Sequence, residues 1–140
     1  MSIKLEYEVL GGNFSTAGTA SDGVKAQLKM LGINSNDIRR VAICMYEGEI
    51  NMVIHAGGGK ANVEIFPDKV IVVLEDNGPG IKDIDKAMQE GYSTASDDIR
   101  NLGFGAGMGL PNMKKCSNSM DIQSTLGKGT TITMTINFTS

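Results

Sequence analysis

Hydrophobic and polar residues alternate with a period of two in several parts of the chain. Residues 3–9 and 61–65 show this alternation, which predicts half-buried strands. The continuous apolar run 70–74 follows a Pro-Asp turn and is typical of a strand that is buried on both faces or central in a sheet. Two more strands are predicted over residues 120–125 and 131–138. The pattern therefore indicates two hairpins and one further strand.

Apolar residues recur at intervals of three and four residues in segments 19–31 and 35–55, which predicts two long helices. Shorter helices are predicted within 81–91 and over 110–116, where Pro111 suits the first turn. Gly32 is the expected C′ residue of the first helix. The expected N-caps are Ser21 or Asp22 for the first long helix and Ser35 or Asn36 for the second.

These elements predict an α+β fold in two layers. Each hairpin is antiparallel, and the amphipathic helices need an apolar surface to cover. We expect a two-layer α/β sandwich: a mixed, mostly antiparallel sheet covered on one face by helices. The other face is expected to be partly exposed or buried in a homodimer. The length of 140 residues fits one domain spanning residues 1–140.

Composition narrows the class of protein. Hydrophobic residues make up 41% of the chain and the formal net charge is −3, so a core can form and a strongly basic footprint for nucleic acid is absent. No apolar run approaches the roughly 20 residues that span a bilayer, and the N-terminus does not resemble a signal peptide. Two cysteines are too few for a disulfide framework. We expect a cytoplasmic protein with no direct nucleic-acid or membrane partner.

The 18 glycines cluster, and their densest cluster precedes the predicted helix 110–116. Alternating glycines leave successive N–H groups free to surround phosphate oxygens, and the helix N-terminus that follows favours negative charge. A flexible linker is the simpler interpretation, but four alternating glycines before a helix exceed what a linker needs. The Gly-Lys-Ser/Thr ending of a P-loop is missing. The candidate phosphate-binding residues are Gly103, Gly105, Ala106, Gly107, Met108, Gly109 and Leu110.

A second candidate segment, Asp76-Asn77-Gly78-Pro79-Gly80, comes directly after the apolar strand 70–74. A carboxylate at a strand end can accept a hydrogen bond from an exocyclic amine such as N6 of adenine. Gly78 and Gly80 would let a flat base approach the backbone. An ordinary Asx-Gly turn is the alternative interpretation of this segment on its own.

A third candidate set lies on the second long helix. Glu47, Asn51 and His55 are spaced four residues apart, which predicts that they share one helix face. Glu47 could accept a proton from a nucleophile, and the amide oxygen of Asn51 is a hard ligand suited to Mg²⁺. A solvated polar face is the alternative interpretation, and His55 is expected to close the helix rather than to act in chemistry.

Together these segments resemble the Bergerat-fold ATPases, which include the ATP-binding domains of gyrase, heat-shock chaperones, mismatch-repair proteins and histidine kinases. Glu47 to Asn51 is similar to the N-box of that family. Asp76-x-Gly78-x-Gly80 and Gly105-x-Gly107-x-Gly109-Leu110 resemble its two glycine boxes, and Gly127-Lys128-Gly129-Thr130 its closing Gly-x-Gly-Thr signature. The four motifs stand in the family's order over about residues 41–136.

The resemblance is strongest to the switch-kinase branch of the bacterial anti-sigma factor serine/threonine kinases. Two stretches carry it: Glu47 to Gly59, and residues 90–96. It implies that Glu47 is the catalytic base, that Asn51 coordinates Mg²⁺, that Asp76 binds the adenine amine and that Thr130 supports it through water. It also implies an ATP lid over residues 93–109, which begins with Ser93 and Thr94.

Two functions follow from the resemblance. The first is an ATP-dependent protein serine/threonine kinase that phosphorylates a serine on an anti-anti-sigma (STAS-type) protein. The second is an ATP-gated module with weak or no catalysis that binds such a partner or a sigma factor. A histidine-kinase catalytic domain is less favoured, because the only histidine, His55, lies within the predicted nucleotide site.

Overall fold

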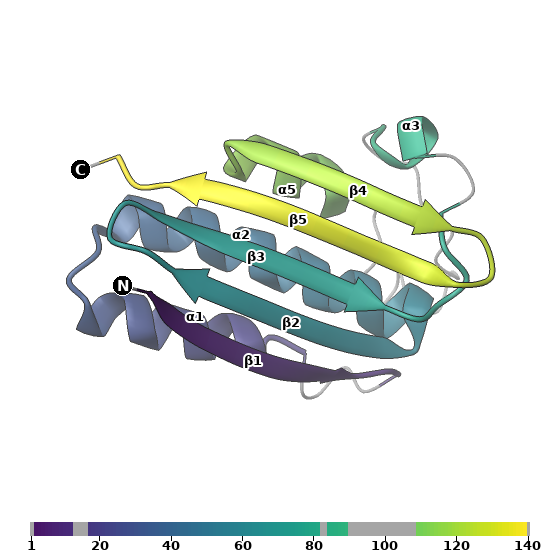
Figure 1. Cartoon of the computed structure of the whole chain (residues 1–140), viewed down its shortest axis with the longest axis horizontal. Helices are drawn as coiled ribbons and strands as arrows, with labels where there is room; N and C mark the ends of the chain where they lie inside the picture. The colour runs from purple at the N-terminus through teal and green to yellow at the C-terminus, as the bar shows by residue number, and fades with distance from the viewer. Residues whose placement is uncertain (1, 13–16, 82–83, 90–108, 140) are drawn as a thin grey trace, which may run out of the picture.

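The computed structural model describes residues 2–12, 17–81, 84–89 and 109–139. Figure 1 shows five strands side by side, with the helices behind them. The elements in chain order are β1 (Ile3–Leu10), α1 (Thr19–Met30), α2 (Ser35–Asn51), the π-helical turn η2 (Met52–Ala56), β2 (Gly58–Ile65), β3 (Lys69–Asp76), α3 (Ile84–Ala87), α5 (Gly109–Cys116), β4 (Ser119–Thr125) and β5 (Gly129–Asn137).

The five strands form one sheet in the order β1-β2-β3-β5-β4. Every pair of neighbours in this sheet is antiparallel, so the pairing is antiparallel throughout rather than mixed. The physical reason is that β4 and β5 form a hairpin, and β5 then inserts beside β3 in the opposite direction. The apolar strand β3 is central, as its composition predicts. Its outward residues Ile71 and Val73 are only half-buried, so β3 is not buried on both faces.

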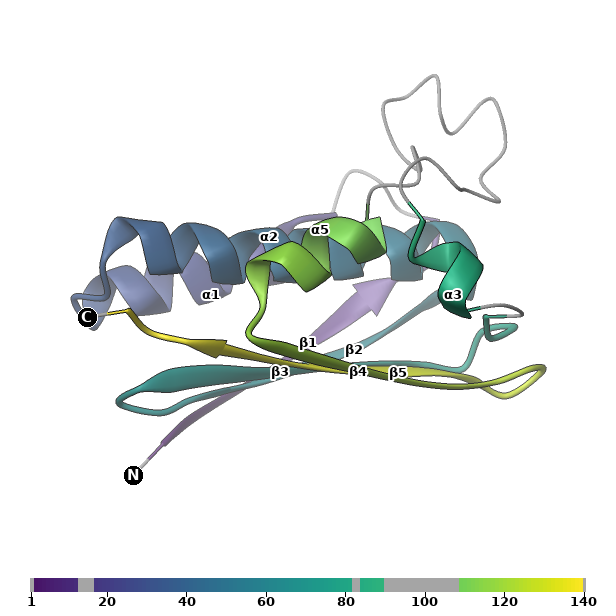
Figure 2. The same cartoon turned by 90° about the horizontal axis from the view of Figure 1, so that it is seen from above.

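The helices that the structure describes lie on one face of the sheet, which makes the predicted two-layer sandwich (Figure 2). The core fills the space between the layers with Val24, Leu28, Val41, Met45, Val63, Val72, Met113 and Met134, each at most 2% exposed. Each such side chain contributes about 1.5–3 kcal/mol when it leaves water. Among the described residues, no helix is long and apolar enough to cross a membrane.

The helix ends differ from the sequence-based expectations at three points. Helix α1 begins at Thr19, as predicted, but its N-cap is Gly18, which has no capping side chain, and not Ser21 or Asp22. Helix α2 is capped by Asn34, whose side chain accepts a hydrogen bond from the Asp37 N–H at 2.9 Å. Gly32 ends α1 as predicted, with a φ of 74°.

The third difference is that the second helix changes character after Asn51. Residues Met52–Ala56 form a π-helical turn, closed by a bond from the Gly57 N–H to the Met52 carbonyl. Because a π-turn advances through i→i+5 bonds, His55 no longer follows Asn51 at the spacing of an α-helix. The predicted alignment of Glu47, Asn51 and His55 on one face is therefore interrupted.

A buried carboxylate fastens the C-terminal end of the chain to the start of α2. Asp37 is fully buried and accepts hydrogen bonds from the Thr139 N–H at 2.8 Å, the Asn34 amide at 2.6 Å and Arg40 at 3.2 Å. Arg40 also donates to the Asn137 carbonyl at 2.8 Å. Burial acts to raise the pKa of Asp37, but the hydrogen bonds from Thr139, Asn34 and Arg40 outweigh it and leave the pKa lowered.

Candidate functional site

The floor of the candidate site is formed where β3 ends and β5 begins. Asp76 and Thr130 are register partners on these strands. One carboxylate oxygen of Asp76, Oδ1, accepts the N–H groups of Gly78 at 2.9 Å and Thr130 at 3.2 Å. These two bonds fix the carboxylate. Its Oδ2 has no hydrogen-bond donor among the described residues, so this oxygen can accept a bond from a ligand amine.

A serine on β4 orders the same corner. Ser124 and Thr130 share a hydrogen bond of 2.9 Å between their hydroxyl oxygens. The Ser124 hydroxyl also accepts the N–H of Ile81 at 2.7 Å, just after the glycine segment that follows β3. Ser124 thus connects the β4–β5 hairpin to the loop that follows Asp76 and holds Thr130, which is 7% exposed, in one orientation.

Two glycines of this corner are required by the backbone. Gly80 has a φ of 81°, and a Cβ there would lie 2.7 Å from the Thr125 carbonyl oxygen. Gly129 has a φ of 134°, and a Cβ there would overlap the Asp76 carbonyl oxygen at 2.0 Å. Side chains at either position would push the β4–β5 turn away from the segment 76–80. These glycines therefore set the shape of the floor.

The wall of the site is formed by α2 and the first turn of α5. A Cβ on Gly109 would lie 3.1 Å from both the Oδ1 and the Nδ2 of Asn51, and 3.4 Å from the Oε2 of Glu47. The structure therefore brings Glu47, Asn51 and Gly109 together, although Gly109 is separated from the other two by about half of the chain. The missing side chain of Gly109 leaves the carboxylate and the amide facing the N-terminus of α5.

Glu47 is half-buried, and burial raises the pKa of its carboxyl above the ordinary value of 4.5. A hydrogen bond from the side chain of Asn112 acts in the opposite direction and lowers the pKa. Asn112 lies in the first turns of α5, one residue after Pro111. The environment thus raises the pKa of Glu47 toward the range of a general base, while Asn112 still stabilises the charged carboxylate.

Close contacts between helix and sheet place the wall next to the floor. A Cβ on Gly48 would lie 2.1 Å from the Leu74 Cδ1, so α2 can approach β3 this closely only with glycine at position 48. A Cβ on Gly59 would lie 2.7 Å from the Met52 Sδ and 3.2 Å from the Asp76 Cβ. Met52, the residue after Asn51, and Asp76, the candidate adenine ligand, therefore both lie against Gly59 of β2.

Gly78 shows a similar approach to the π-helical turn. A Cβ there would lie 2.6 Å from the Cα and 2.7 Å from the Cβ of Ala56. The end of η2 thus packs directly on the segment after Asp76. His55, in the same turn, is half-buried, and burial lowers its pKa, which favours the neutral imidazole.

Part of the predicted site lies outside the described residues. These positions are Ser93, Thr94, Gly103, Gly105, Ala106, Gly107 and Met108, together with most of the predicted lid. Of the second glycine box, the structure describes Gly109 and Leu110. The side chain of Leu110 is 8% exposed and belongs to the hydrophobic core, so only its backbone is available to a ligand.

Sequence reasoning missed Asn112, Ser124 and the structural role of Glu49. Counting the register of the hairpin around Gly127 would have placed Ser124 opposite Thr130. No sequence signal marks Asn112 beyond its place in the first turns of a helix. Glu49 is two residues from Asn51 and points away from it, because it is buried against α1.

Oxygen donors at the wall fit a magnesium ion that is shared with phosphates. Within the residues that the structure describes, no three His, Cys, Asp or Glu side chains come together as a metal site. Mg²⁺ is typically held by one or two protein oxygens plus substrate phosphates, so a dedicated cluster is not required. The amide oxygen of Asn51, beside the side-chain-free Gly109, is the donor that fits this mode.

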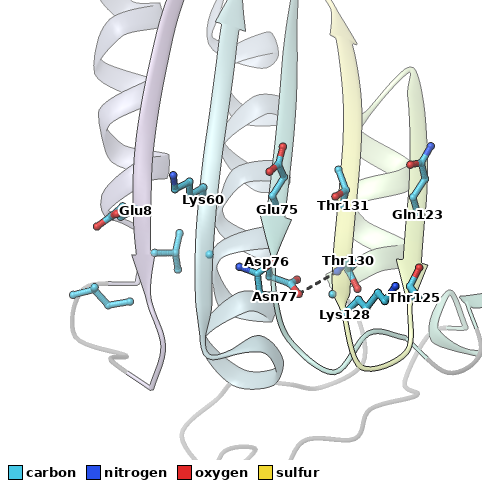
Figure 3. Close-up of a pocket in the computed structure, with 14 residues that line it drawn as sticks. Glu8, Lys60, Glu75, Asp76, Asn77, Gln123, Thr125, Lys128, Thr130 and Thr131 are labelled. Atoms are coloured by element: carbon cyan, nitrogen blue, oxygen red, sulfur yellow. Dashed lines mark hydrogen bonds between the residues drawn. The ribbon is translucent and has the colours of Figure 1, made fainter.

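A hollow of about 680 Å³ lies on the open side of the sheet (Figure 3). It is lined by a row of register partners across the five strands: Glu8, Lys60, Glu75, Thr131 and Gln123. Asp76 and Thr130 reach its border, but Glu47 and Asn51 do not line it. The absence of Glu47 and Asn51 from its lining distinguishes it from the corner of Asp76, Asn51 and Gly109, which we take as the candidate site.

Comparison with known proteins identifies a family for this chain. Residues 36–140 match the model of the family described as histidine kinase-, DNA gyrase B- and HSP90-like ATPase. The serine/threonine-protein kinase RsbT of Bacillus subtilis is 33% identical over 108 residues, which cover 74% of this chain and 75% of that protein. An anti-sigma F factor of Caldanaerobacter subterraneus is 30% identical over 138 residues, with 95% and 91% coverage.

Two solved structures share the fold. The RsbU and RsbW domains of Rv1364c from Mycobacterium tuberculosis align with a TM-score of 0.62 and 18% identity. The alignment covers 97% of this chain, which spans 32% of that longer chain. The mycobacterial sensor histidine kinase MprB aligns with a TM-score of 0.54 and 14% identity, over 97% of this chain and 98% of that chain. At these identities the likeness concerns the fold alone.

Proposed function

This chain belongs to the family of histidine kinase-, DNA gyrase B- and HSP90-like ATPases, and we propose that it is an ATP-dependent protein serine/threonine kinase of the anti-sigma factor type. Its substrate is a serine on an anti-anti-sigma protein of the STAS type. The similarity to the kinase RsbT and to anti-sigma F factors supports this class of partner. A cytoplasmic location is part of the proposal, because sigma factors act there.

The observation that carries the proposal is the meeting of Glu47 and Asn51 at Gly109. Phosphoryl transfer depends mainly on positioning and on stabilisation of charge, with one group to orient or deprotonate the nucleophile. Glu47 is half-buried with a raised pKa, and Asn51 provides a neutral oxygen donor within the same small region.

Each residue has a defined part in this reaction. The free Oδ2 of Asp76 accepts the adenine amine, and the backbone N–H groups at the start of α5 face the phosphates. Asn51 is the candidate ligand of Mg²⁺, which when bound neutralises phosphate charge. The serine oxygen forms a bond to the γ-phosphorus, the bond from that phosphorus to the β,γ-bridging oxygen breaks, and ADP leaves. The serine proton passes to Glu47.

The test compares wild type with Glu47→Gln in transfer of label from γ-labelled ATP to an anti-anti-sigma protein encoded in the same genome. We expect Glu47→Gln to lose transfer by about 10²- to 10⁴-fold, the usual worth of general base catalysis, while it still binds ATP. Glu6→Gln is the matched control, because Glu6 is exposed on β1 far from α2. Equal transfer by wild type and Glu47→Gln would refute the assigned base.

A second function, a nucleotide-gated binding module, is supported by the similarity to anti-sigma F factors. In this case ATP would increase the affinity for an anti-anti-sigma protein or a sigma factor, and transfer would be slow or absent. Partner affinity is measured with ATP and with ADP, for wild type and for Glu47→Gln. The same affinity in all four measurements would discard the module.

A further inference from the structure

A second acidic residue of α2 is buried without a part in the proposed reaction. Glu49 is 2% exposed and lies two residues from both Glu47 and Asn51 along α2. Its Oε2 accepts the N–H groups of Gly18 at 2.9 Å and Ala20 at 3.2 Å. Its Oε1 accepts the N–H of Ser21 at 2.7 Å. One carboxylate from α2 thus takes three backbone donors at the start of α1.

These bonds replace a local cap. The first N–H groups of any helix lack partners within the helix, and a side chain at the N-cap usually satisfies one of them. Gly18 has no side chain, so α1 depends on a carboxylate about thirty residues further along the chain. An ionised carboxylate is well suited to this role, because it only accepts hydrogen bonds and lies at the positive end of the α1 dipole.

The surroundings show that Glu49 sits where three elements meet. The pKa of Tyr7, on β1, is raised by its own burial and by the negative charge of Glu49. Tyr7 also packs on α1, since a Cβ on Gly23 would lie 2.6 Å from the Tyr7 hydroxyl. Burial raises the pKa of Glu49 itself, and its three N–H partners act to lower it. The carboxylate is therefore enclosed between α1, α2 and β1.

The same helix carries the proposed catalytic groups on its other side. At 100° per residue, Glu49 points about 200° away from Glu47 and from Asn51. Helix α2 is thus held from two directions: by α1 through Glu49, and by α5 through Glu47, Asn51 and their contacts at Gly109 and Asn112. Breaking the bonds of Glu49 removes one of these two restraints on the rotation of α2 about its own axis.

A small rotation of α2 about its axis is enough to misalign Glu47 and Asn51. A side-chain tip lies roughly 5–6 Å from the axis of a helix, so a turn of about 10° moves it by about 1 Å. A displacement of that size can cost on the order of 10²-fold in rate, because the reacting atoms must be aligned. The closeness of Gly48 to Leu74 gives α2 little room to turn without losing its contact with the sheet.

We propose that Glu49 is a positioning residue: by binding the backbone N–H groups at the start of α1, it fixes the rotation of α2 and so aligns Glu47 and Asn51 for phosphoryl transfer. The proposal rests on the proposed kinase function. It gives the backbone N–H groups at the start of α1 an indirect part in positioning, although no residue of α1 is assigned to the nucleotide site. Only loss of these N–H contacts with Glu49 is then transmitted to the site.

The decisive variant is Glu49→Gln, which keeps the shape of the side chain but presents an NH₂ group to N–H donors. Amide hydrogen exchange at Gly18, Ala20 and Ser21 reports whether the contact with α1 is lost. We expect faster exchange there, a kcat of phosphoryl transfer lowered about 10- to 100-fold at saturating ATP, and a smaller change in KM for the protein substrate.

Two controls separate positioning from general loss of stability. Ser21→Ala removes the bond of 3.1 Å from the Ser21 hydroxyl to the Ala42 carbonyl, a second link between α1 and α2, and leaves the bonds of Glu49 in place. Asp37→Asn weakens the fold at the far end of α2. We expect both controls to retain kcat within about threefold of wild type at a temperature where all variants are folded.

The outcomes are distinct. Faster amide exchange with unchanged kcat and unchanged Mg-ATP affinity in Glu49→Gln would overturn the proposal, and so would an equal loss of kcat in Asp37→Asn. If wild type transfers no phosphoryl group to any candidate partner, the kinase function fails instead. The proposal is then decided by binding of a fluorescent ATP analogue with Mg²⁺: weaker binding in Glu49→Gln alone supports it, and equal binding in all variants refutes it.

Discussion

Replacing Gly48 with alanine tests whether the contact between α2 and β3 sets the geometry of the site. The new Cβ would lie 2.1 Å from the Leu74 Cδ1 and 3.3 Å from the Leu74 Cγ. Carbon atoms pack at about 3.5–4.0 Å, so the first contact overlaps by about 1.5 Å. Either Leu74 changes rotamer within a core where it is 3% exposed, or α2 moves away from the sheet.

The magnitude follows from two opposing effects. Overpacking of a core costs about 1–3 kcal/mol, whereas alanine in place of glycine within a helix gains up to about 1 kcal/mol. Gly48→Ala should therefore lower the free energy of unfolding by about 0–3 kcal/mol. Leu74→Val removes the clashing Cδ1 and, taken alone, costs on the order of 1 kcal/mol through the lost methylene. The double variant should lose less than the sum of the single variants, by about 1–3 kcal/mol.

The assay is urea unfolding of the wild type, both single variants and the double variant, followed by measurement of ATP-analogue affinity for each protein. We expect Gly48→Ala to bind nucleotide more weakly, because Glu47 and Asn51 move relative to Asp76, and the double variant to recover part of this affinity. Unfolding free energies that add within about 0.5 kcal/mol would refute the reasoning, since they would show that Gly48 and Leu74 do not interact.

Three other measurements test the site and the fold. In Asn112→Leu the pKa of Glu47 should rise further, because the hydrogen bond that lowers it is lost, so the acid limb of the pH–rate profile should move to higher pH; an unmoved limb would exclude Glu47 as the titrating base. In Asp76→Asn the ATP affinity should fall about 10- to 100-fold, the worth of one charge-assisted hydrogen bond, with little change in urea unfolding; calorimetric titration showing unchanged affinity would contradict the adenine assignment. The folded-state pKa of Asp37 is below its ordinary value of 3.8, so its contribution to stability is complete above that pH and is lost as the pH falls through the folded-state pKa. Asp37→Asn should lower stability at neutral pH by on the order of 1–3 kcal/mol and should flatten this acid-dependent loss, as followed by circular dichroism.

The periodicity of hydrophobic residues along the chain was sufficient to predict the two layers and the strands and helices named here. The alternation in residues 3–9 predicts β1, and the run 70–74 predicts the central strand β3. Both signals are strong because burial of one face imposes a period of two along a strand, and such a pattern needs no knowledge of distant residues. The helix 110–116 was likewise predicted within one residue of its observed start at Gly109.

The errors occurred where a distant residue replaced a local one. The N-cap of α1 was misplaced at Ser21 or Asp22, because the partner of its first N–H groups is Glu49, on another helix. No sequence signal indicates that α2 continues into a π-helical turn, because Asn51 and His55 keep the four-residue spacing of one face of an α-helix. Glycine destabilises the interior of a helix, and only the side chain of Leu74 on the sheet explains why glycine stands at position 48.

By itself the sequence determined the two-layer fold, the family and the residue types of the candidate site, because hydrophobic period and motif order can be followed along the chain without knowledge of tertiary contacts. Only the tertiary structure decided that Gly109 meets Glu47 and Asn51, that Asp76 keeps one oxygen free, and that the carboxylate of Glu49 is enclosed by α1. These contacts join residues far apart in the sequence. Close packing of side chains and the need to pair every buried polar group select them, and neither condition can be evaluated before the elements are assembled.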